Sequence, residues 1–431
     1  MASVAFHTLG CKVNQYDTQA MLELFRARGW DIVDFDRAAD VYVINTCTVT
    51  GTGDKKSLNT VRRCQRLNPE AHVVICGCLA QRDGEKLLET GARLVIGNAR
   101  RGEVVDLLEE AVRENRQICA VGDIRRAAYE PLRISADEGK TRAVIKIQEG
   151  CDRFCTYCII PYVRGGIRSR LPRDIHEEAL RLAANGYREL VLTGIHLTSY
   201  GRDLENCSLL DAVLACDVDG VERIRLGSLE PVIATEEFAG KLAQISKVCP
   251  QFHLALQSGS DAVLQRMRRR YTTKEFARSC DALRKFFPDC ALTTDVICGF
   301  PGETEEEFEQ TMAFCKKIGF ARLHVFPYSA RKGTKAADMP GQIPKALREE
   351  RARRLIALGK ETAKEYAGRL LHTVQPVLFE EMHEGICSGY TPQYMTVQAK
   401  GNLQGQILPV LLESLDENGF IGRICPERTI E

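Results

Sequence analysis

The middle of the chain alternates short apolar strands with helical segments, and this alternation limits the folds that the chain can adopt. Helices are predicted after Pro172 and over residues 235–245, 274–287 and 305–318. Because alternating strands and helices form parallel sheets, six such units predict an α/β fold, an incomplete (β/α)₈ barrel. The six predicted strands are residues 144–147, 190–192, 223–226, 252–256, 292–297 and 323–328.

Polar or glycine-rich turns follow several of these strands, at the end of a parallel barrel where binding sites are expected. Taken alone, each of these sequences is explained by ordinary turn formation. Their common position at one rim, together with a cysteine-rich loop after the first strand, indicates a functional site. The turns are Thr193-Gly194, Gly227-Ser228, residues 257–260 and residues 299–303.

The cysteine-rich loop places Cys151, Cys155 and Cys158 within eight residues. Three thiolates can hold an iron–sulfur cluster and leave one iron without a protein ligand, where a small molecule can bind. Structural zinc is the alternative. Zinc takes four ligands, and no His or Cys follows Cys158 closely enough to form the second half of a zinc finger. The spacing therefore favours an open iron–sulfur cluster.

A second cysteine set lies in the N-terminal part, where Cys11, Cys47 and Cys78 each follow a predicted strand. In an open parallel sheet these strand ends meet at one edge, so the three thiols are expected to converge as a second incomplete ligand set. Cys64 and Cys76 are excluded, because the first is predicted within a helix and the second within a strand. The three strands are residues 4–8, 41–45 and 72–76.

The composition limits the cellular compartment and the kinds of partner that are expected for the protein. The 431 residues include 59 basic and 58 acidic side chains, so no global field attracts polyanions. No run approaches the roughly 18 apolar residues of a membrane span, and residues 1–10 lack the features of a signal peptide. The 18 cysteines show no paired framework spacing, which suits a reducing compartment. We therefore expect a cytoplasmic protein without a membrane partner.

The C-terminal segment, residues 371–431, has the pattern of a small all-β barrel but carries only three basic against eight acidic side chains. Tyr390, Tyr394 and Lys400 are candidates for RNA contact by stacking and charge. Packing of the two tyrosines within the barrel is an equal alternative. The predicted strands are residues 373–379, 394–398, 407–413 and 420–424, and the three basic residues are Lys400, Arg423 and Arg428.

Positive charge is denser elsewhere in the chain. Arg266 and residues 268–270 give four arginines within five residues, and the predicted helix over residues 345–369 has eight basic against four acidic side chains. Phosphate contacts are candidates at both places, although a solvated face explains the helix equally well. Further candidates for contact with RNA or a substrate carboxylate are Arg164, Arg168 and Arg170.

The Cys-x₃-Cys-x₂-Cys spacing of the loop resembles the signature of radical S-adenosylmethionine (SAM) enzymes, in which SAM ligates the open iron of a 4Fe-4S cluster. In this resemblance Tyr157 packs near the adenine of SAM, and Thr193-Gly194 receives its methionyl amino group. Residues 299–303 lie beside the adenine. The cofactor contacts that the resemblance implies are Tyr157, Thr193, Gly194, Ser228, Glu230, Gln257, Ser258, Asp295 and Gly299.

The surroundings of Cys11, Cys47 and Cys78, at residues 9–14, 45–49 and 77–81, resemble those of the methylthiotransferases within this superfamily. The resemblance covers essentially the whole chain. It implies an N-terminal cluster-binding domain, a radical SAM barrel with a trailing helix, and a C-terminal TRAM barrel. The expected boundaries are 1–115, a linker at 116–140, then 141–370 and 371–431.

The subgroups of that family modify isopentenyladenosine or threonylcarbamoyladenosine in tRNA, or an aspartate of a ribosomal protein. Residues 389–394 are most similar to the bacterial members that act on threonylcarbamoyladenosine at position 37, next to the anticodon. The resemblance implies methylthiolation of adenine C2 with two 4Fe-4S clusters and two SAM molecules per turnover. It also implies a tRNA anticodon stem-loop and a reductant protein such as flavodoxin or ferredoxin as partners. The other two subgroups and a non-catalytic iron–sulfur RNA sensor are the alternatives.

Overall fold

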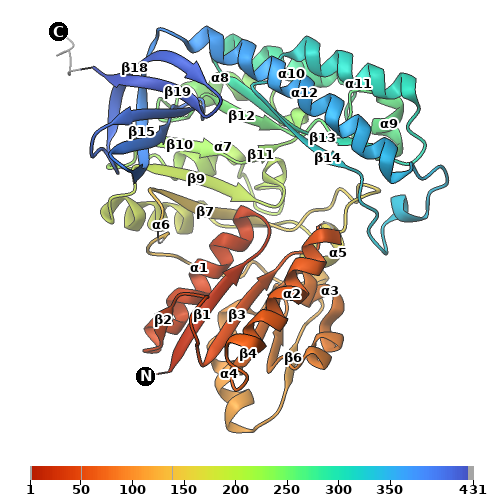
Figure 1. The fold of residues 1–431 in the computed structure, drawn as a ribbon, viewed down its shortest axis with the longest axis vertical. Coiled ribbons are helices and arrows are strands. Elements are labelled where there is room, and N and C mark those ends of the chain that lie inside the picture. The colour runs from red at the N-terminus through yellow and green to blue at the C-terminus, as the bar shows by residue number, and fades with distance from the viewer. Residues whose placement is uncertain (1, 50, 138, 426–431) are drawn as a thin grey trace.

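The N-terminal domain is built on six parallel strands in the order β2-β1-β3-β4-β5-β6 (Figure 1). The computed structural model describes residues 2–49, 51–137 and 139–425. The three predicted N-terminal strands are present as β1, β3 and β4, which are neighbours in this sheet. The strands are β1 Ser3–Thr8, β2 Asp31–Val33, β3 Val41–Thr46, β4 His72–Gly77, β5 Leu94–Ile96 and β6 Ile118–Ala120.

Helices cover both faces of this sheet, because β3 and β4 bury apolar side chains on both sides. Phe25 and Leu108 pack on one face, and Val61 and Leu79 pack on the other. The two excluded cysteines are core residues: Cys64 lies in α2 and Cys76 in β4. The helices are α1 Lys12–Ala27, α2 Gly51–Leu67, α3 Cys78–Asp83 and α4 Val104–Arg113, with 3₁₀ turns η1 Gly84–Thr90 and η2 Arg101–Glu103.

The central part of the chain forms the predicted partial barrel from two four-stranded sheets, β10-β9-β7-β8 and β11-β12-β13-β14. Strand β10 pairs with β9, and β11, which follows β10 directly in the chain, pairs with β12. The two sheets therefore form one continuous curved wall. Six strands are those predicted from the alternation: β7 Arg142–Glu149, β9 Glu189–Gly194, β10 Arg223–Leu226, β12 Gln251–Leu254, β13 Ala291–Cys298 and β14 Arg322–Pro327. Two short ones are additional: β8 Arg168–Ser169 and β11 Ser228–Leu229.

Local capping explains where the barrel helices begin. The helix predicted over residues 235–245 starts one residue later, because the Thr235 hydroxyl accepts a hydrogen bond from the Phe238 N–H at 3.1 Å. Within the described residues, no helix has the length and apolar composition that crossing a membrane requires. The helices are α5 Ile160–Arg164, α6 Pro172–Ala184, α7 Leu209–Leu214, α8 Glu236–Ala243, α9 Asp261–Arg266, α10 Thr273–Phe286, α11 Glu305–Ile318 and α12 Lys345–Leu370. The 3₁₀ turns are η3 Ile124–Arg126, η4 Leu197–Ser199, η5 Pro231–Ile233 and η6 Lys335–Asp338.

Helix α1 joins the N-terminal domain to the barrel. Tyr16 on α1 is buried in the barrel core, and its hydroxyl donates to the Leu132 carbonyl at 2.9 Å and to Glu178 Oε1 at 3.0 Å. The two parts therefore share apolar packing and buried hydrogen bonds.

The C-terminal segment closes into the predicted small β-barrel, which has five strands in the order β15-β16-β17-β19-β18. Strand β16 is absent from the strands predicted by sequence, because its Cys-Ser-Gly stretch lacks a β-branched pattern. Arg428 lies outside the described residues. The strands are β15 Val374–His383, β16 Ile386–Tyr390, β17 Thr396–Lys400, β18 Ile407–Asp416 and β19 Gly419–Ile424.

Tyr390 and Tyr394 attach this small barrel to the amino ends of the central barrel strands. Their rings stack with centroids 4.6 Å apart, and the Arg142 guanidinium lies about equally close to both rings. The Arg225 guanidinium lies 4.8 Å from the Tyr394 ring and donates to the Pro392 carbonyl at 2.8 Å. Of the two sequence alternatives, packing is therefore the role seen for these tyrosines.

Candidate active site

The loop after β7 holds the first cysteine set in a tight turn. The Cys151 N–H donates to the Gly165 carbonyl at 2.9 Å, and the Cys158 N–H donates to the Cys155 carbonyl at 3.0 Å. Gly150 has φ +74°, and a Cβ there would lie 1.7 Å from the Gly166 carbonyl oxygen, so only glycine fits. Burial, and then the neighbouring thiols, raise the pKa of Cys151 to about 11 and that of Cys158 to about 12.

An arginine from the predicted basic run faces this loop. Arg269 Nη1 donates to Cys155 Sγ at 3.2 Å, and its Nη2 lies 2.9 Å from Glu230 Oε1. Glu230 also pairs with Arg153 at 2.9 Å and with His196 Nε2 at 3.2 Å. Burial opposes ionisation of Glu230, but the hydrogen bond from His196 and the arginine charges outweigh it and lower the pKa to about 2.

The second cysteine set converges at the edge of the N-terminal sheet, as predicted. Cys11 caps α1, Cys47 follows β3, and Cys78 is the first residue of α3. A Cβ on Gly10, whose φ is +106°, would lie 2.9 Å from Cys47 Cβ and 3.0 Å from its sulfur, which shows how closely the first two segments approach. Burial, and then charge interaction with Cys78 and Cys11, raise the pKa of Cys47 to about 11.

A buried charge network lies between the two cysteine sets, with Arg164 at its centre. Arg164 ends α5, a few residues after Cys158, yet its Nε donates to Cys78 Sγ at 3.2 Å. Its Nη1 lies 3.0 Å from Glu149 and 3.2 Å from Asp17. The guanidinium is fully buried and therefore links one sulfur of the N-terminal set to the residue that precedes the barrel loop.

The charges that pair directly in this network balance. Three buried cations face three carboxylates. Arg168 lies nearby, but its guanidinium donates to the Ile124 and Arg164 carbonyls rather than to a carboxylate. The paired cations are Arg101, Lys146 and Arg164, and the carboxylates are Asp17, Glu130 and Glu149.

This network corrects one expectation from the sequence. Arg164, Arg168 and Arg170 were predicted as candidates for RNA or substrate contact, but all three are buried. Arg170 pairs with Glu178 inside the barrel wall. Sequence position alone did not distinguish them, because their partners come from other segments of the chain: α1 for Arg164, η3 for Arg168 and α6 for Arg170.

A cavity of about 260 Å³ opens beside the barrel cysteine loop, where the N-terminal domain meets the barrel. Val49, two residues after Cys47, lines it from the N-terminal domain, and Cys158 lines it from the barrel loop. Gln257 is held at its wall, because its N–H donates to the Asp295 carbonyl and its carbonyl accepts from the Ile297 N–H, both at 2.9 Å. The lining residues are Val49, Tyr157, Cys158, Ile159, Ile160, Gln257, Asp295, Ile297, Phe326, Pro327, Tyr328 and Ser329.

Three of the expected cofactor contacts, Tyr157, Gln257 and Asp295, thus line one cavity. Tyr328 was not foreseen; its buried hydroxyl has no hydrogen-bond partner among the described residues and is free to meet a ligand. Val49, three residues after the end of β3, and Phe326, within β14, were also missed.

The remaining expected contacts lie at the rim but outside the cavity lining. The Ser258 hydroxyl is buried against Thr311 of α11, at 3.2 Å. The Gly299 N–H donates to Glu303 Oε1 at 2.8 Å, and its Cα side packs on Arg348 of α12. Gly194 packs against Gln148, Thr193 is buried and Ser228 is exposed.

No group of three or more His, Cys, Asp or Glu side chains within the described residues is arranged to hold a single metal ion. The donor chemistry of the two sets is nevertheless uniform. Each offers three thiols, the soft ligands that iron–sulfur clusters take, beside an arginine that donates to one sulfur. The residues present therefore fit two such clusters.

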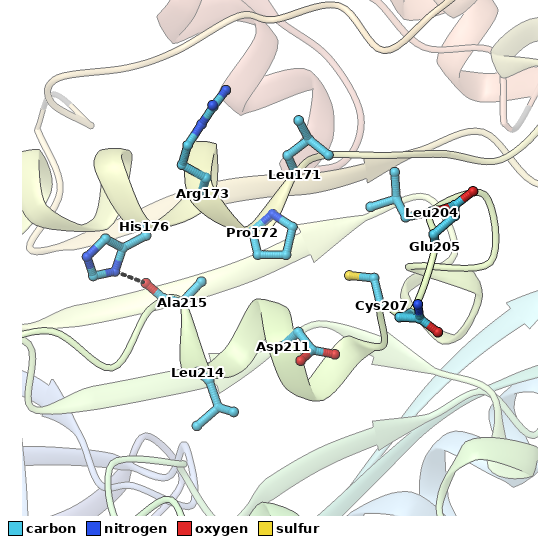
Figure 2. Close-up of a pocket in the computed structure, with 11 residues that line it drawn as sticks. Leu171, Pro172, Arg173, His176, Leu204, Glu205, Cys207, Asp211, Leu214 and Ala215 are labelled. Carbon is cyan, nitrogen blue, oxygen red and sulfur yellow. Dashed lines mark hydrogen bonds between the residues drawn. The ribbon is translucent and has the colours of Figure 1, made fainter.

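A larger depression, of about 670 Å³, lies elsewhere on the barrel, over α6 and α7 (Figure 2). Figure 2 shows His176 turned toward the Ala215 carbonyl, 3.1 Å from its Nδ1, and Leu214 turned away from the other side chains. None of the predicted site residues lines this depression.

Comparison with known proteins agrees with this architecture. Residues 3–97 match the uncharacterized protein family UPF0004, and residues 145–315 match the radical SAM superfamily. The chain is 45% identical over 421 residues to threonylcarbamoyladenosine tRNA methylthiotransferase MtaB of Bacillus subtilis, covering 95% of this chain and 93% of the relative. It is 35% identical over 440 residues to tRNA-2-methylthio-N(6)-dimethylallyladenosine synthase of Syntrophotalea carbinolica, covering 98% and 99%.

A solved structure shares the fold. The radical SAM methyltransferase TsrM of Kitasatospora setae superposes with a TM-score of 0.57 at 14% identity, covering 90% of this chain and 81% of that one. Enzymes of the radical SAM type use a 4Fe-4S cluster and SAM as cofactors. With near full-length similarity to curated methylthiotransferases, the chain belongs to the radical S-adenosylmethionine methylthiotransferase family.

Proposed function

We propose that this enzyme adds a methylthio group to C2 of N6-threonylcarbamoyladenosine at position 37 of tRNA, next to the anticodon. The observation that carries the choice of substrate is the 45% identity to a relative named for threonylcarbamoyladenosine, against 35% to one named for dimethylallyladenosine. The tRNA anticodon stem-loop is the proposed partner, and flavodoxin or ferredoxin is the proposed reductant.

Two 4Fe-4S clusters are assigned to the two cysteine sets. Cys151, Cys155 and Cys158 would hold the cluster that binds SAM, and the N-terminal set would hold the auxiliary one. When bound, these cofactors supply the hydrogen abstraction at adenine C2 and the methylthio group, using two SAM molecules per turnover. The auxiliary ligands are Cys11, Cys47 and Cys78.

Side chains of the protein itself shape the cavity in which we propose that the reaction occurs. Apolar groups such as Val49, Ile297 and Phe326 line the cavity, so a bound substrate would displace water from it and limit side reactions. Tyr157, Gln257, Asp295 and the free Tyr328 hydroxyl are polar groups that can orient SAM and the adenine. The expected SAM contacts at Thr193, Gly194, Ser228, Glu230, Ser258 and Gly299 belong to the same proposal.

Nucleoside analysis of tRNA from cells that lack the gene tests the substrate. Loss of the methylthio form of threonylcarbamoyladenosine supports the proposal. Loss of the methylthio form of isopentenyladenosine would instead assign the second candidate function, methylthiolation of isopentenyladenosine. The similarity to a dimethylallyladenosine synthase supports this candidate. No change in either nucleoside contradicts a tRNA substrate.

A further inference from the structure

Helix α2 carries a row of basic side chains that the enzyme's own structure leaves unpaired. Lys55, Arg62 and Arg66 recur at helical spacing with Asn59, so all four lie on one face, and all are exposed. Within the described residues, none of the three cations forms an ion pair. Arg63, on the adjacent face, is by contrast neutralised by Asp36. We call Lys55, Arg62 and Arg66 the α2 stripe.

The α2 stripe begins beside the cavity. The first turn of α2 meets the loop after β14, where the Gly51 N–H lies 3.5 Å from Ser329 Oγ and Asp54 pairs with Arg331 at 2.5 Å. Ser329 itself lines the cavity. The same loop exposes Lys332 and Lys335.

Large aromatic side chains are exposed on segments that contribute to the cavity lining. Phe154, Tyr162 and Phe326 leave 47%, 48% and 46% of their surfaces exposed. Phe326 lines the cavity itself. Phe154 belongs to the barrel cysteine loop and Tyr162 to α5, and their rings meet edge to face with centroids 5.6 Å apart. Exposed rings beside unpaired cations are what single-stranded RNA loops need, because bases stack on rings while phosphates meet cations.

The other candidate surfaces offer less free charge beside the cavity. In the C-terminal barrel, residues 371–425 carry two basic side chains, and Arg423 is paired with Glu413. On α12, Arg351 and Arg354 are paired with glutamates of α11. Lys360 and Lys364 of α12 are exposed, but they line a separate depression next to the C-terminal barrel. The basic run after α9 turns Arg266 and Arg269 inward, toward Glu307 and Cys155.

We propose that the RNA substrate lies along the α2 stripe, with Lys332 and Lys335 on the opposite bank and its unstacked loop bases on Phe154, Tyr162 and Phe326. From Lys55 to Arg66 the stripe is about 17 Å long, enough to follow several phosphates. This inference rests on the proposed function, because it assumes an RNA substrate. It assigns RNA contacts to the N-terminal domain and the barrel loop.

Charge reversal tests the surface. A Lys55→Glu/Arg62→Glu/Arg66→Glu variant is compared with a control of equal charge change, Lys316→Glu/Lys317→Glu/Arg353→Glu, whose residues are exposed on α11 and α12. The probe is a synthetic anticodon stem-loop containing N6-threonylcarbamoyladenosine. Fluorescence anisotropy measures its binding to the reconstituted full-length enzyme at several salt concentrations.

The stripe variant should bind the RNA at least tenfold more weakly than the control, and its salt slope should fall by about 2, since three phosphate contacts are lost. RNA-independent cleavage of SAM should stay as in the wild type, which shows that the variant is folded and loaded. If the wild type binds and modifies the RNA but the stripe variant binds as tightly as the control, the surface is wrong. If the wild type neither binds nor modifies the RNA, the proposed function itself fails.

Discussion

The two cysteine sets reach similar chemistry by different routes. The barrel set comes from one loop of eight residues, so a local turn fixes the relative positions of its thiols. The N-terminal set comes from three strand ends and is complete only when β1, β3 and β4 are aligned in the sheet. One set is therefore a property of a segment, and the other is a property of the fold.

The two cysteine sets also differ in how far they depend on the rest of the molecule. Cys155 receives a hydrogen bond from Arg269 within the same barrel, whereas Cys78 receives one from Arg164, which belongs to the other domain. The N-terminal set should consequently respond to changes at the domain junction that leave the barrel set intact.

Removing the thiols gives the largest expected effects. The wild type should bind two four-iron clusters after anaerobic reconstitution, and either triple Cys→Ala variant should bind one and form no methylthio product. Only the variant of Cys151, Cys155 and Cys158 should also lose SAM cleavage, because in the proposed mechanism the other set holds the cluster for sulfur transfer. Iron and sulfide counts and 5′-deoxyadenosine formation measure these outcomes. A single cluster in the wild type contradicts the assignment of the N-terminal set.

Replacing Arg164 by methionine should impair the N-terminal set selectively. The change removes the donor to Cys78 and leaves Asp17 and Glu149 short of a buried partner, at a cost of about 3–5 kcal/mol in stability. In a Cys151→Ala/Cys155→Ala/Cys158→Ala background, the remaining cluster should be lost to a chelator about 10–100-fold more readily. Its reduction potential should become more negative, because a hydrogen bond to sulfur is lost.

Arg225→Met is the matched control for that variant. Arg225 is equally buried and pairs with Glu189, but it lies at the opposite end of the barrel strands. It should lower the melting temperature while leaving chelator resistance and potential unchanged. If both variants lose the cluster equally, Arg164 supports it only through the overall stability of the fold.

Alanine at the glycine before each first cysteine should separate the two sets again. Gly150→Ala forces a Cβ onto the Gly166 backbone, which cannot move aside, so the barrel loop and SAM cleavage should be lost. Gly10→Ala meets the Cys47 side chain instead, so loss of the auxiliary cluster with retained SAM cleavage is expected. Iron content and 5′-deoxyadenosine formation distinguish the two results; loss of SAM cleavage in Gly10→Ala would contradict the separation.

The same asymmetry explains what the sequence could predict. Cys151 to Cys158 were recognisable because their spacing is local, and convergence of the other three followed from the rule that parallel strands end together. Side-chain direction was not predictable. Arg164 turns inward and Ser258 faces α11 because tertiary neighbours, absent from local patterns, provide their partners. The cavity wall at Tyr328 was missed for the same reason.

The smallest predicted effect concerns the ion pairs that tie the Cys47 loop to the barrel. Thr48 donates to Asp54 at 2.6 Å, and Asp54 pairs with Arg82 at 2.9 Å and with Arg331 of the barrel loop. Burial disfavours the Asp54 carboxylate, but hydrogen bonds from Thr48, Arg331 and Arg82 outweigh it and lower the pKa. A lowered pKa in the folded state stabilises the fold above the unfolded value of about 3.9.

Asp54→Asn should therefore cost about 1–2 kcal/mol at neutral pH. The difference from the wild type should shrink as pH falls below about 4 and vanish once the folded-state carboxyl is protonated. Asp106→Asn, which breaks an exposed pair with Arg28, should change little at any pH. Thermal unfolding from pH 7 to pH 3 measures both. Because Asp54 holds the Cys47 segment from one side only, its loss should weaken the auxiliary cluster less than Arg164→Met does. If Asp54→Asn weakens the cluster as much or more, the Asp54 ion pairs, and not Arg164, are the main support of the N-terminal set.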